Sequence, residues 1–311
     1  MPDFSISQPH FQDADKAREY LERQVWPTGP VCPHCGSVKA PYELKGKSNR
    51  PGLYKCADCR EPFTVTVGSI FERSKVPLNK WLLAVYLLCS SKKGMSSHQL
   101  HRMLGVTYKT AWFMTHRIRE AMGTTGGLLG SGGQPVEVDE TYWGNLKSAP
   151  KQPKGGWGHK MKVVTLVERD GIKRSHAMTR VTSKTLKPVL DAQISKKARL
   201  MTDESQLYNK LGGAYAQHGI VNHSAGQYSD GDITTNTAES SFAILKRGLY
   251  GTFHHVGEQH LQRYATEFDF RWNHRTKLGF TDSQRANALL GQIAGKRLTY
   301  RRIDGEGNSL N

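Results

Sequence analysis

The hydrophobic pattern changes character near residue 136. Before it, apolar residues at helical spacing predict helices over 11–24, 80–91, 96–104 and 108–122, and alternation predicts a strand over 62–71. After it, apolar segments predict strands over 136–139, 163–168, 173–181 and 199–203, with helices over 187–194, 235–251 and 258–275. The second part is therefore predicted to be a mixed α/β domain, preceded by a smaller and mainly helical region.

Three acidic residues occupy special places in the second part. Asp139 falls where the strand containing Val136 and Val138 runs out, and Asp203 ends the short strand RLMTD. Strand ends are where α/β sheets hold their chemistry. Glu239 lies on the helix predicted over 235–251. We expect these three carboxylates to meet, with Asp203 preferred over its neighbour Glu204 because Asp203 ends the strand.

Composition indicates a polyanionic partner. The 311 residues include 44 Lys and Arg against 27 Asp and Glu, which gives a net charge of +17. Such an excess is typical of proteins that bind nucleic acid. No apolar run reaches the roughly 18 residues of a membrane span, and the N-terminus has no apolar signal-peptide core. The expectation is a cytoplasmic, nucleoid-associated protein that binds DNA and no membrane.

Four of the five cysteines form two Cys-x2-Cys pairs, separated by the 20 residues 36–55. In a reducing compartment this spacing predicts four thiolates around one tetrahedral Zn²⁺. The predicted ligands are Cys32, Cys35, Cys56 and Cys59. Four thiolates leave no open position for water, so the zinc is expected to be structural. Cys89 stands alone in an apolar helix and is interpreted as a core residue.

The two helices over 96–104 and 108–122 are joined by a short turn at Gly105, and Thr107 is placed to cap the second helix. This layout predicts a helix-turn-helix, whose second helix enters the DNA major groove. Candidate DNA contacts near its outer face are Lys109, His116 and Arg117.

A Gly-rich stretch marks the main domain boundary. The predicted organisation is an N-terminal helix (1–28), a zinc ribbon (29–75), a helix-turn-helix region (76–123), a Gly-rich linker (124–135), the α/β domain (136–290) and a basic tail (291–311).

The chain resembles the ISXO-type branch of bacterial insertion-sequence DDE transposases. The motifs that carry the resemblance are WPTGPVCPHCG, FTVTVGSIFERSKVPLNKWLLAVYLLCSSKKG, LGVTYKTAWFMTHRIREAM, VDETYWG and NTAESSFAILKRGLYGTFHHV. The acid spacing agrees, because 35 residues, 204–238, separate Asp203 from Glu239, and Lys246 follows seven residues after Glu239. The resemblance covers about residues 10–280 and implies a ribonuclease H-like fold for the α/β domain.

The resemblance also implies a catalytic site for two Mg²⁺ or Mn²⁺ ions. Asp139 would bridge both ions, with Asp203 completing one shell and Glu239 the other. In related transposases an Asn can take the third position, so Asn236, one helical turn before Glu239, is an auxiliary or alternative ligand. Lys246 shares the face of Glu239 and can meet a phosphate. Arg247 beside it is a further candidate DNA contact.

These features favour a DNA transposase that binds terminal inverted repeats and target DNA and catalyses strand cleavage and strand transfer. Two DNA ends require two sites, so a homodimer or higher oligomer is expected on DNA. The alternative is a non-catalytic zinc-ribbon and helix-turn-helix regulator derived from a transposase. A third hypothesis is a nuclease that cuts DNA but does not join it.

Overall fold

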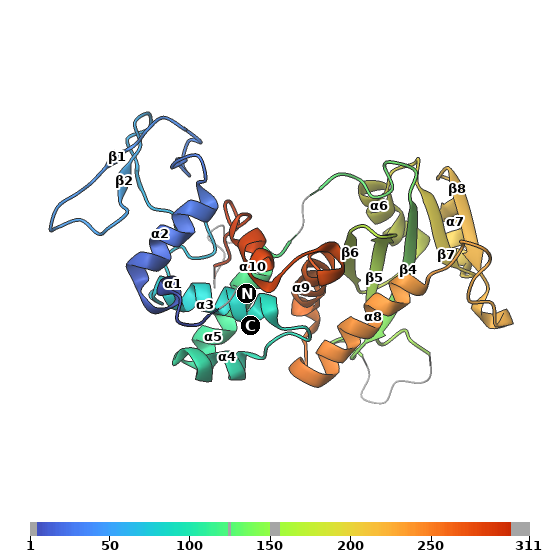
Figure 1. The fold of residues 1–311 in the computed structure, drawn as a ribbon. Helices are drawn as coiled ribbons and strands as arrows, with labels where there is room; N and C mark the ends of the chain where they lie inside the picture. Colours follow the sequence, from blue (N-terminus) through green and yellow to red (C-terminus); the bar gives the residue numbers. More distant parts are fainter. Residues whose placement is uncertain (1–4, 124–125, 150–155, 300–311) are drawn as a thin grey trace. The chain divides into compact units, whose positions relative to one another are not determined.

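The computed structural model describes residues 5–123, 126–149 and 156–299. The chain forms two compact units (Figure 1), one built from residues up to 122 together with those from 279 onward, the other from residues 123–278. In the described parts of the chain, no helix combines the length and apolar character that crossing a membrane requires.

The first unit begins with two short helices and a ribbon. Helix α1 spans Pro9–Gln12 and α2 spans Ala14–Val25. Asp13 caps α2 by accepting a hydrogen bond from the backbone N–H of Lys16. The ribbon strands β1 (Tyr42–Glu43), β2 (Tyr54–Lys55) and β3 (Pro62–Phe63) pair antiparallel in that order. The strand predicted over 62–71 therefore ends at Phe63, because successive turns through the positive φ of Gly68 replace the rest.

Four helices complete the first unit: α3 (Leu78–Ser90), α4 (Ser97–Leu104), α5 (Tyr108–Ala121) and α10 (Asp282–Leu290). The predicted helix-turn-helix is present as α4 and α5. Gly105 adopts the left-handed conformation between them (φ 60°), and Ser96 and Thr107 cap the two helices. The lone Cys89 is buried in α3 as predicted.

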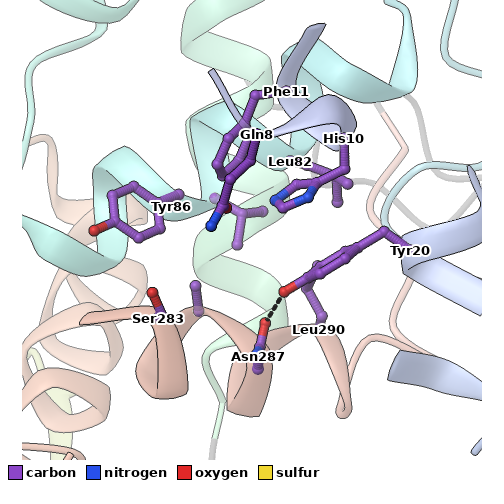
Figure 2. A pocket seen from close by; sticks show the side chains of 11 residues that line it. Gln8, His10, Phe11, Tyr20, Leu82, Tyr86, Ser283, Asn287 and Leu290 are labelled. Atoms are coloured by element: carbon purple, nitrogen blue, oxygen red, sulfur yellow. Dashed lines mark hydrogen bonds between the residues drawn. The ribbon is translucent and has the colours of Figure 1, made fainter. Parts of the chain in front are cut away.

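Helix α10 returns to the first unit from the far end of the sequence. Its Arg285 donates a hydrogen bond to the carbonyl oxygen of Cys89, 2.8 Å away. Asn287 accepts one from the hydroxyl of Tyr20, beside a small pocket that Phe11 also lines (Figure 2). The predicted catalytic domain ran to residue 290, whereas the structure places residues 279–299 in the first unit. The rest of the predicted basic tail, 300–311, lies outside the described residues.

The second unit is built on a five-stranded mixed sheet. Its strands are β4 (Pro135–Trp143), β5 (Met161–Glu168), β6 (Lys173–Met178), β7 (Arg199–Asp203) and β8 (Gln217–Val221). The spatial order is β6-β5-β4-β7-β8, with β4 antiparallel to β5 and parallel to β7. This is the ribonuclease H-like arrangement that the resemblance implied. Strand β8 was not predicted, because QHGIV carries only a weak apolar pattern.

Helices cover both faces of the sheet. On one face, α6 (Ser183–Gln193) and α7 (Gln206–Gly212) pack on a core that includes Val136, Val138 and Leu166. On the other, α8 (Asn236–Gly248) and α9 (Leu261–Asn273) pack on Trp143 and Val163. Shorter helical turns are His223–Ala225, Leu249–Phe253, Glu258–His260 and Thr276–Leu278. Successive side chains of β4 point to opposite faces of the sheet, so every second side chain of this strand faces α8.

Candidate metal centre and active site

The four cysteines of the ribbon form a compact ligand set. Their sulfur atoms all lie within 4.8 Å of one another. The Sγ atoms of Cys32 and Cys59 are 3.7 Å apart, as are those of Cys35 and Cys56. A tetrahedron with Zn–S bonds of about 2.3 Å has edges of about 3.8 Å, so the arrangement fits a zinc ion. A backbone N–H at residue 59 helps lower the pKa of Cys56 to about 6, which favours the thiolate that binds metal.

Of the three residues predicted to contact DNA from α5, the structure leaves one on the surface. Lys109 is exposed in the first turn of the helix. His116 and Arg117 are buried, so the prediction that they lie near the outer face is wrong. Arg117 donates a hydrogen bond to the carbonyl oxygen of Glu72 (2.7 Å) and its guanidinium lies 5.5 Å from the ring centre of Trp81. Its charged group therefore ties α5 to the rest of the first unit.

Strands β4 and β7 bring two of the predicted acids to the same sheet face. The last paired residues of this parallel ladder are Glu137 and Met201. Asp139 and Asp203 each lie two residues further along, and side chains two apart point to the same face. The sequence predicted strand-end positions for both acids. Asp203 does end β7, but Asp139 lies in the middle of β4, which continues to Trp143 because it stays paired with β5, so the strand end predicted at Asp139 is wrong. The two acids are neighbours because β4 pairs parallel with β7 just before them.

The third acid comes from the first turn of α8, which a buried carboxylate anchors. Glu137 is 0% exposed and accepts hydrogen bonds from the backbone N–H groups of Thr237 (2.8 Å) and Ala238 (3.0 Å). It also pairs with Arg169 at 3.0 Å. A carboxylate at a helix N-terminus satisfies free N–H groups and the helix dipole. Glu137 therefore fixes the start of the helix that carries Glu239.

The role of Glu137 was missed in the sequence. Its position two residues before Asp139 puts it on the same strand face as that predicted ligand. The available signal was an acidic residue between Val136 and Val138 in the predicted strand, on the same strand face as Asp139. A buried charge of that kind requires partners, but the sequence does not identify them.

The charges of the other two predicted ligands act on Asp139. Burial, together with the nearby charges of Glu140, Asp203 and Glu239, raises the pKa of Asp139 to about 7. The pKa of Asp203 is also raised, mainly by burial. Carboxylates that repel one another in a partly buried place are suited to a divalent cation, which takes oxygen ligands. The donor set therefore fits Mg²⁺ or Mn²⁺.

The three carboxylates are close but are not gathered at ion-binding distance. Among the described residues, only the four cysteines bring three or more His, Cys, Asp or Glu ligand atoms within 4.8 Å of one another. A side-chain adjustment is therefore required before all three acids can share ions.

Glu204, the alternative second acid, is already occupied. Its carboxylate accepts hydrogen bonds from the backbone N–H groups of His223 (2.9 Å) and Ser224 (3.0 Å), and from the Ser224 hydroxyl (2.6 Å). The hydrogen bond from that hydroxyl leads the interactions that lower the pKa of Glu204 to about 2. The carboxylate of Asp203 accepts a bond from the backbone N–H of Ser205. The geometry therefore agrees with choosing Asp203 rather than Glu204.

A second acid follows Asp139 on the opposite face of β4. The hydroxyl of the buried Tyr208 donates a hydrogen bond to Glu140. Burial and the charge of Asp203 raise the pKa of Glu140, while the tyrosine hydrogen bond opposes that rise. The sequence analysis did not single out either residue. Together the half-buried Glu140 and the buried Tyr208 form a polar pair on the face of β4 opposite Asp139.

The remaining predicted residues lie along α8. Asn236 is exposed at the first position of the helix, Lys246 is half-buried and Arg247 is exposed. The Nε of Arg247 donates to the carbonyl oxygen of Ala243, 3.1 Å away. Helical spacing keeps Asn236 and Lys246 on the face of Glu239, so the structure leaves both available to the candidate site.

A mixed sheet with acids on the neighbouring strands β4 and β7, together with a four-cysteine ribbon, is typical of a zinc-ribbon protein with a transposase-type α/β domain. Comparison with protein families agrees. The ISXO2-like transposase domain matches residues 128–273, and the transposase zinc-ribbon domain matches residues 12–61. Both matches fall on the segments whose motifs carried the resemblance, the cysteine ribbon and the α/β domain.

Two known proteins are similar to this chain. The "Uncharacterized protein in transposable element ISH50" of Halobacterium salinarum (strain ATCC 700922 / JCM 11081 / NRC-1) is 28% identical over 279 residues, which cover 84% of this chain and 91% of that protein. A solved structure, "Crystal structure of a pre-cleavage Mos1 transpososome", aligns over 91% of this chain and 93% of its own at 13% identity, with a TM-score of 0.21. At that score the structural likeness is too weak to bear on fold or function.

Proposed function

We propose that this protein is a metal-dependent DNA transposase that binds the terminal inverted repeats of an insertion sequence and catalyses strand cleavage and strand transfer. The observation that carries the proposal is that Asp139 and Asp203 lie on neighbouring parallel strands, each two residues beyond the last β4–β7 pair, on the sheet face that α8 covers. The family match supports a nuclease or transferase chemistry at this site.

Bound Mg²⁺ or Mn²⁺ would supply activation of the attacking water or 3′-hydroxyl and stabilisation of the leaving oxygen. In this proposal the carboxylates of Asp139, Asp203 and Glu239 would together hold these ions. Asn236 supports the same position from one turn earlier on the helix. Lys246, on the face of Glu239, would hold a phosphate oxygen of the DNA strand by a charge-assisted hydrogen bond.

The first unit would provide DNA binding. The helix-turn-helix formed by α4 and α5 presents Lys109 at the exposed N-terminal end of its second helix, the end that reads base edges in this motif. Arg247 on α8 would contact the backbone of the DNA near the cleavage site. Two ends must be processed together, so we propose a homodimer or higher oligomer on DNA.

The test is strand cleavage and strand transfer on DNA carrying the repeat ends, with Mg²⁺ or Mn²⁺. Asp203→Asn is expected to lower the rate at least a hundredfold, because it removes a charged ligand. Asp230→Asn is the matched control, since Asp230 is an exposed acid in a nearby turn. Full activity in Asp203→Asn would refute the assignment.

One observation favours a second candidate function. The three carboxylates are not gathered at ion-binding distance among the described residues, as expected of a DNA-binding regulator that lost catalysis. Normal binding to repeat DNA with no metal-dependent cleavage by the unaltered protein would support that candidate. Cleavage without strand transfer would instead indicate a nuclease.

A further inference from the structure

His223 connects two parts of the candidate site. Its Nε2 atom lies 3.4 Å from a carboxylate oxygen of Glu239 and 3.1 Å from the hydroxyl of Thr235. Thr235 is fully buried, whereas the Glu239 side chain is 46% exposed. The histidine therefore gives a partly free carboxylate a fixed neighbour.

The backbone of His223 is itself held in place. Glu204 accepts hydrogen bonds from the N–H groups of His223 and Ser224, which begin the helical turn at residues 223–225. Glu204 follows Asp203 directly at the end of β7. A continuous series of contacts thus runs from the strand end that carries Asp203, through Glu204 and His223, to Glu239.

We propose that His223 is a positioning residue that keeps the carboxylate of Glu239 oriented beside Asp139 and Asp203 before a divalent ion arrives. This inference rests on the proposed function, because it takes Glu239 as the third metal ligand. A long, half-exposed Glu side chain loses rotamer freedom when it is fixed. His223 reduces that cost by restricting the side chain to a region from which a side-chain adjustment brings it to the ions, the general benefit of preorganisation. Glu204 in turn holds the backbone of His223 through the hydrogen bond that it accepts from the His223 N–H group.

The test measures Mn²⁺ binding to the full-length, zinc-loaded protein without DNA, by calorimetric titration. His223→Ala is expected to weaken Mn²⁺ affinity about tenfold, the scale typical for loss of a residue that orients a metal ligand. His223→Gln keeps an N–H donor and is expected to recover most of the affinity. In a Glu239→Gln background, His223→Ala is expected to change affinity less than twofold.

The outcomes separate this inference from the proposed function. If Asp203→Asn leaves Mn²⁺ binding unchanged, the proposed metal site itself is wrong. If Asp203→Asn abolishes binding but His223→Ala matches the unaltered protein, only the role of His223 is overturned. Tighter binding by His223→Ala would also overturn it, because the histidine would then be holding Glu239 away from the ion. If His223→Ala does not fold, the Mn²⁺ affinity of His223→Gln tests the role of His223 instead: affinity tighter than that of the unaltered protein would overturn it.

Discussion

Replacing Glu137 by Gln should destabilise the second unit while leaving its shape almost unchanged. Glu137 is fully buried and its carboxylate accepts hydrogen bonds from Thr237 and Ala238, besides pairing with Arg169. Gln has the same size but no charge, and its amide nitrogen cannot accept a hydrogen bond. The substitution therefore removes the charge of the ion pair and one acceptor oxygen at the start of α8.

The size of the effect follows from these contacts. Breaking a buried ion pair by removing one charge costs about 3–5 kcal/mol. The Arg169 side chain remains 24% exposed, so water can partly solvate it and the lower end of that range applies. Loss of charge at the helix N-terminus adds about 0.5–1 kcal/mol. We expect a loss of about 3–4 kcal/mol, which for a unit of this size lowers its melting temperature by about 10 °C.

Differential scanning calorimetry of the full-length protein would measure this loss. Asp170→Asn is the matched control, because the Asp170 side chain is 78% exposed and forms a surface pair with Lys277. Such pairs contribute about 0–1 kcal/mol. A melting temperature for Glu137→Gln within 2 °C of the control, on the scale of about 2–4 °C per kcal/mol, would refute the anchoring role of Glu137.

Two further predictions concern charge and burial. The pKa of Asp139 is raised, chiefly by burial, to about 7 in the folded state. Between about pH 4 and about pH 7 the folded state therefore keeps a proton that the unfolded state loses. As pH rises through this window, the contribution of Asp139 to the free energy of unfolding decreases. Asp139→Asn should therefore gain stability relative to the unaltered protein as pH rises across that window. The measurement is the melting temperature of both proteins without added divalent ions. A difference in melting temperature that stays constant with pH would contradict the prediction. Lys109→Ala should weaken binding to repeat DNA and reduce the dependence of log affinity on log salt concentration by about one. Arg117→Ala should chiefly lower the melting temperature of the first unit. A large change in that salt dependence for Arg117→Ala, without destabilisation, would contradict its buried role.

Local pattern was sufficient for several parts of this protein. Cysteine spacing specified the zinc ribbon, because a tetrahedral thiolate site requires two closely spaced pairs and little else. Cap and turn residues specified the helix-turn-helix, since Ser96, Gly105 and Thr107 act on their immediate neighbours. Alternation located the start of β4, although the strand continues beyond Asp139 to Trp143. These features depend on residues that are near one another in the sequence.

Other features required the tertiary structure, because they depend on which side of an element is covered. His116 and Arg117 are polar, yet they are buried where α5 packs within the first unit. Residues 279–299 join the first unit because Arg285 and Asn287 find partners there.

The candidate site shows the same division. The sequence by itself located Asp203 at a strand end and Glu239 near a helix start, but it ended the strand of Asp139 too early. Only the fold decided that β4 lies beside β7, that Glu137 fixes the start of α8 and that His223 neighbours Glu239. The physical reason is that pairing between distant segments is set by the packing of the whole core, which no local pattern encodes.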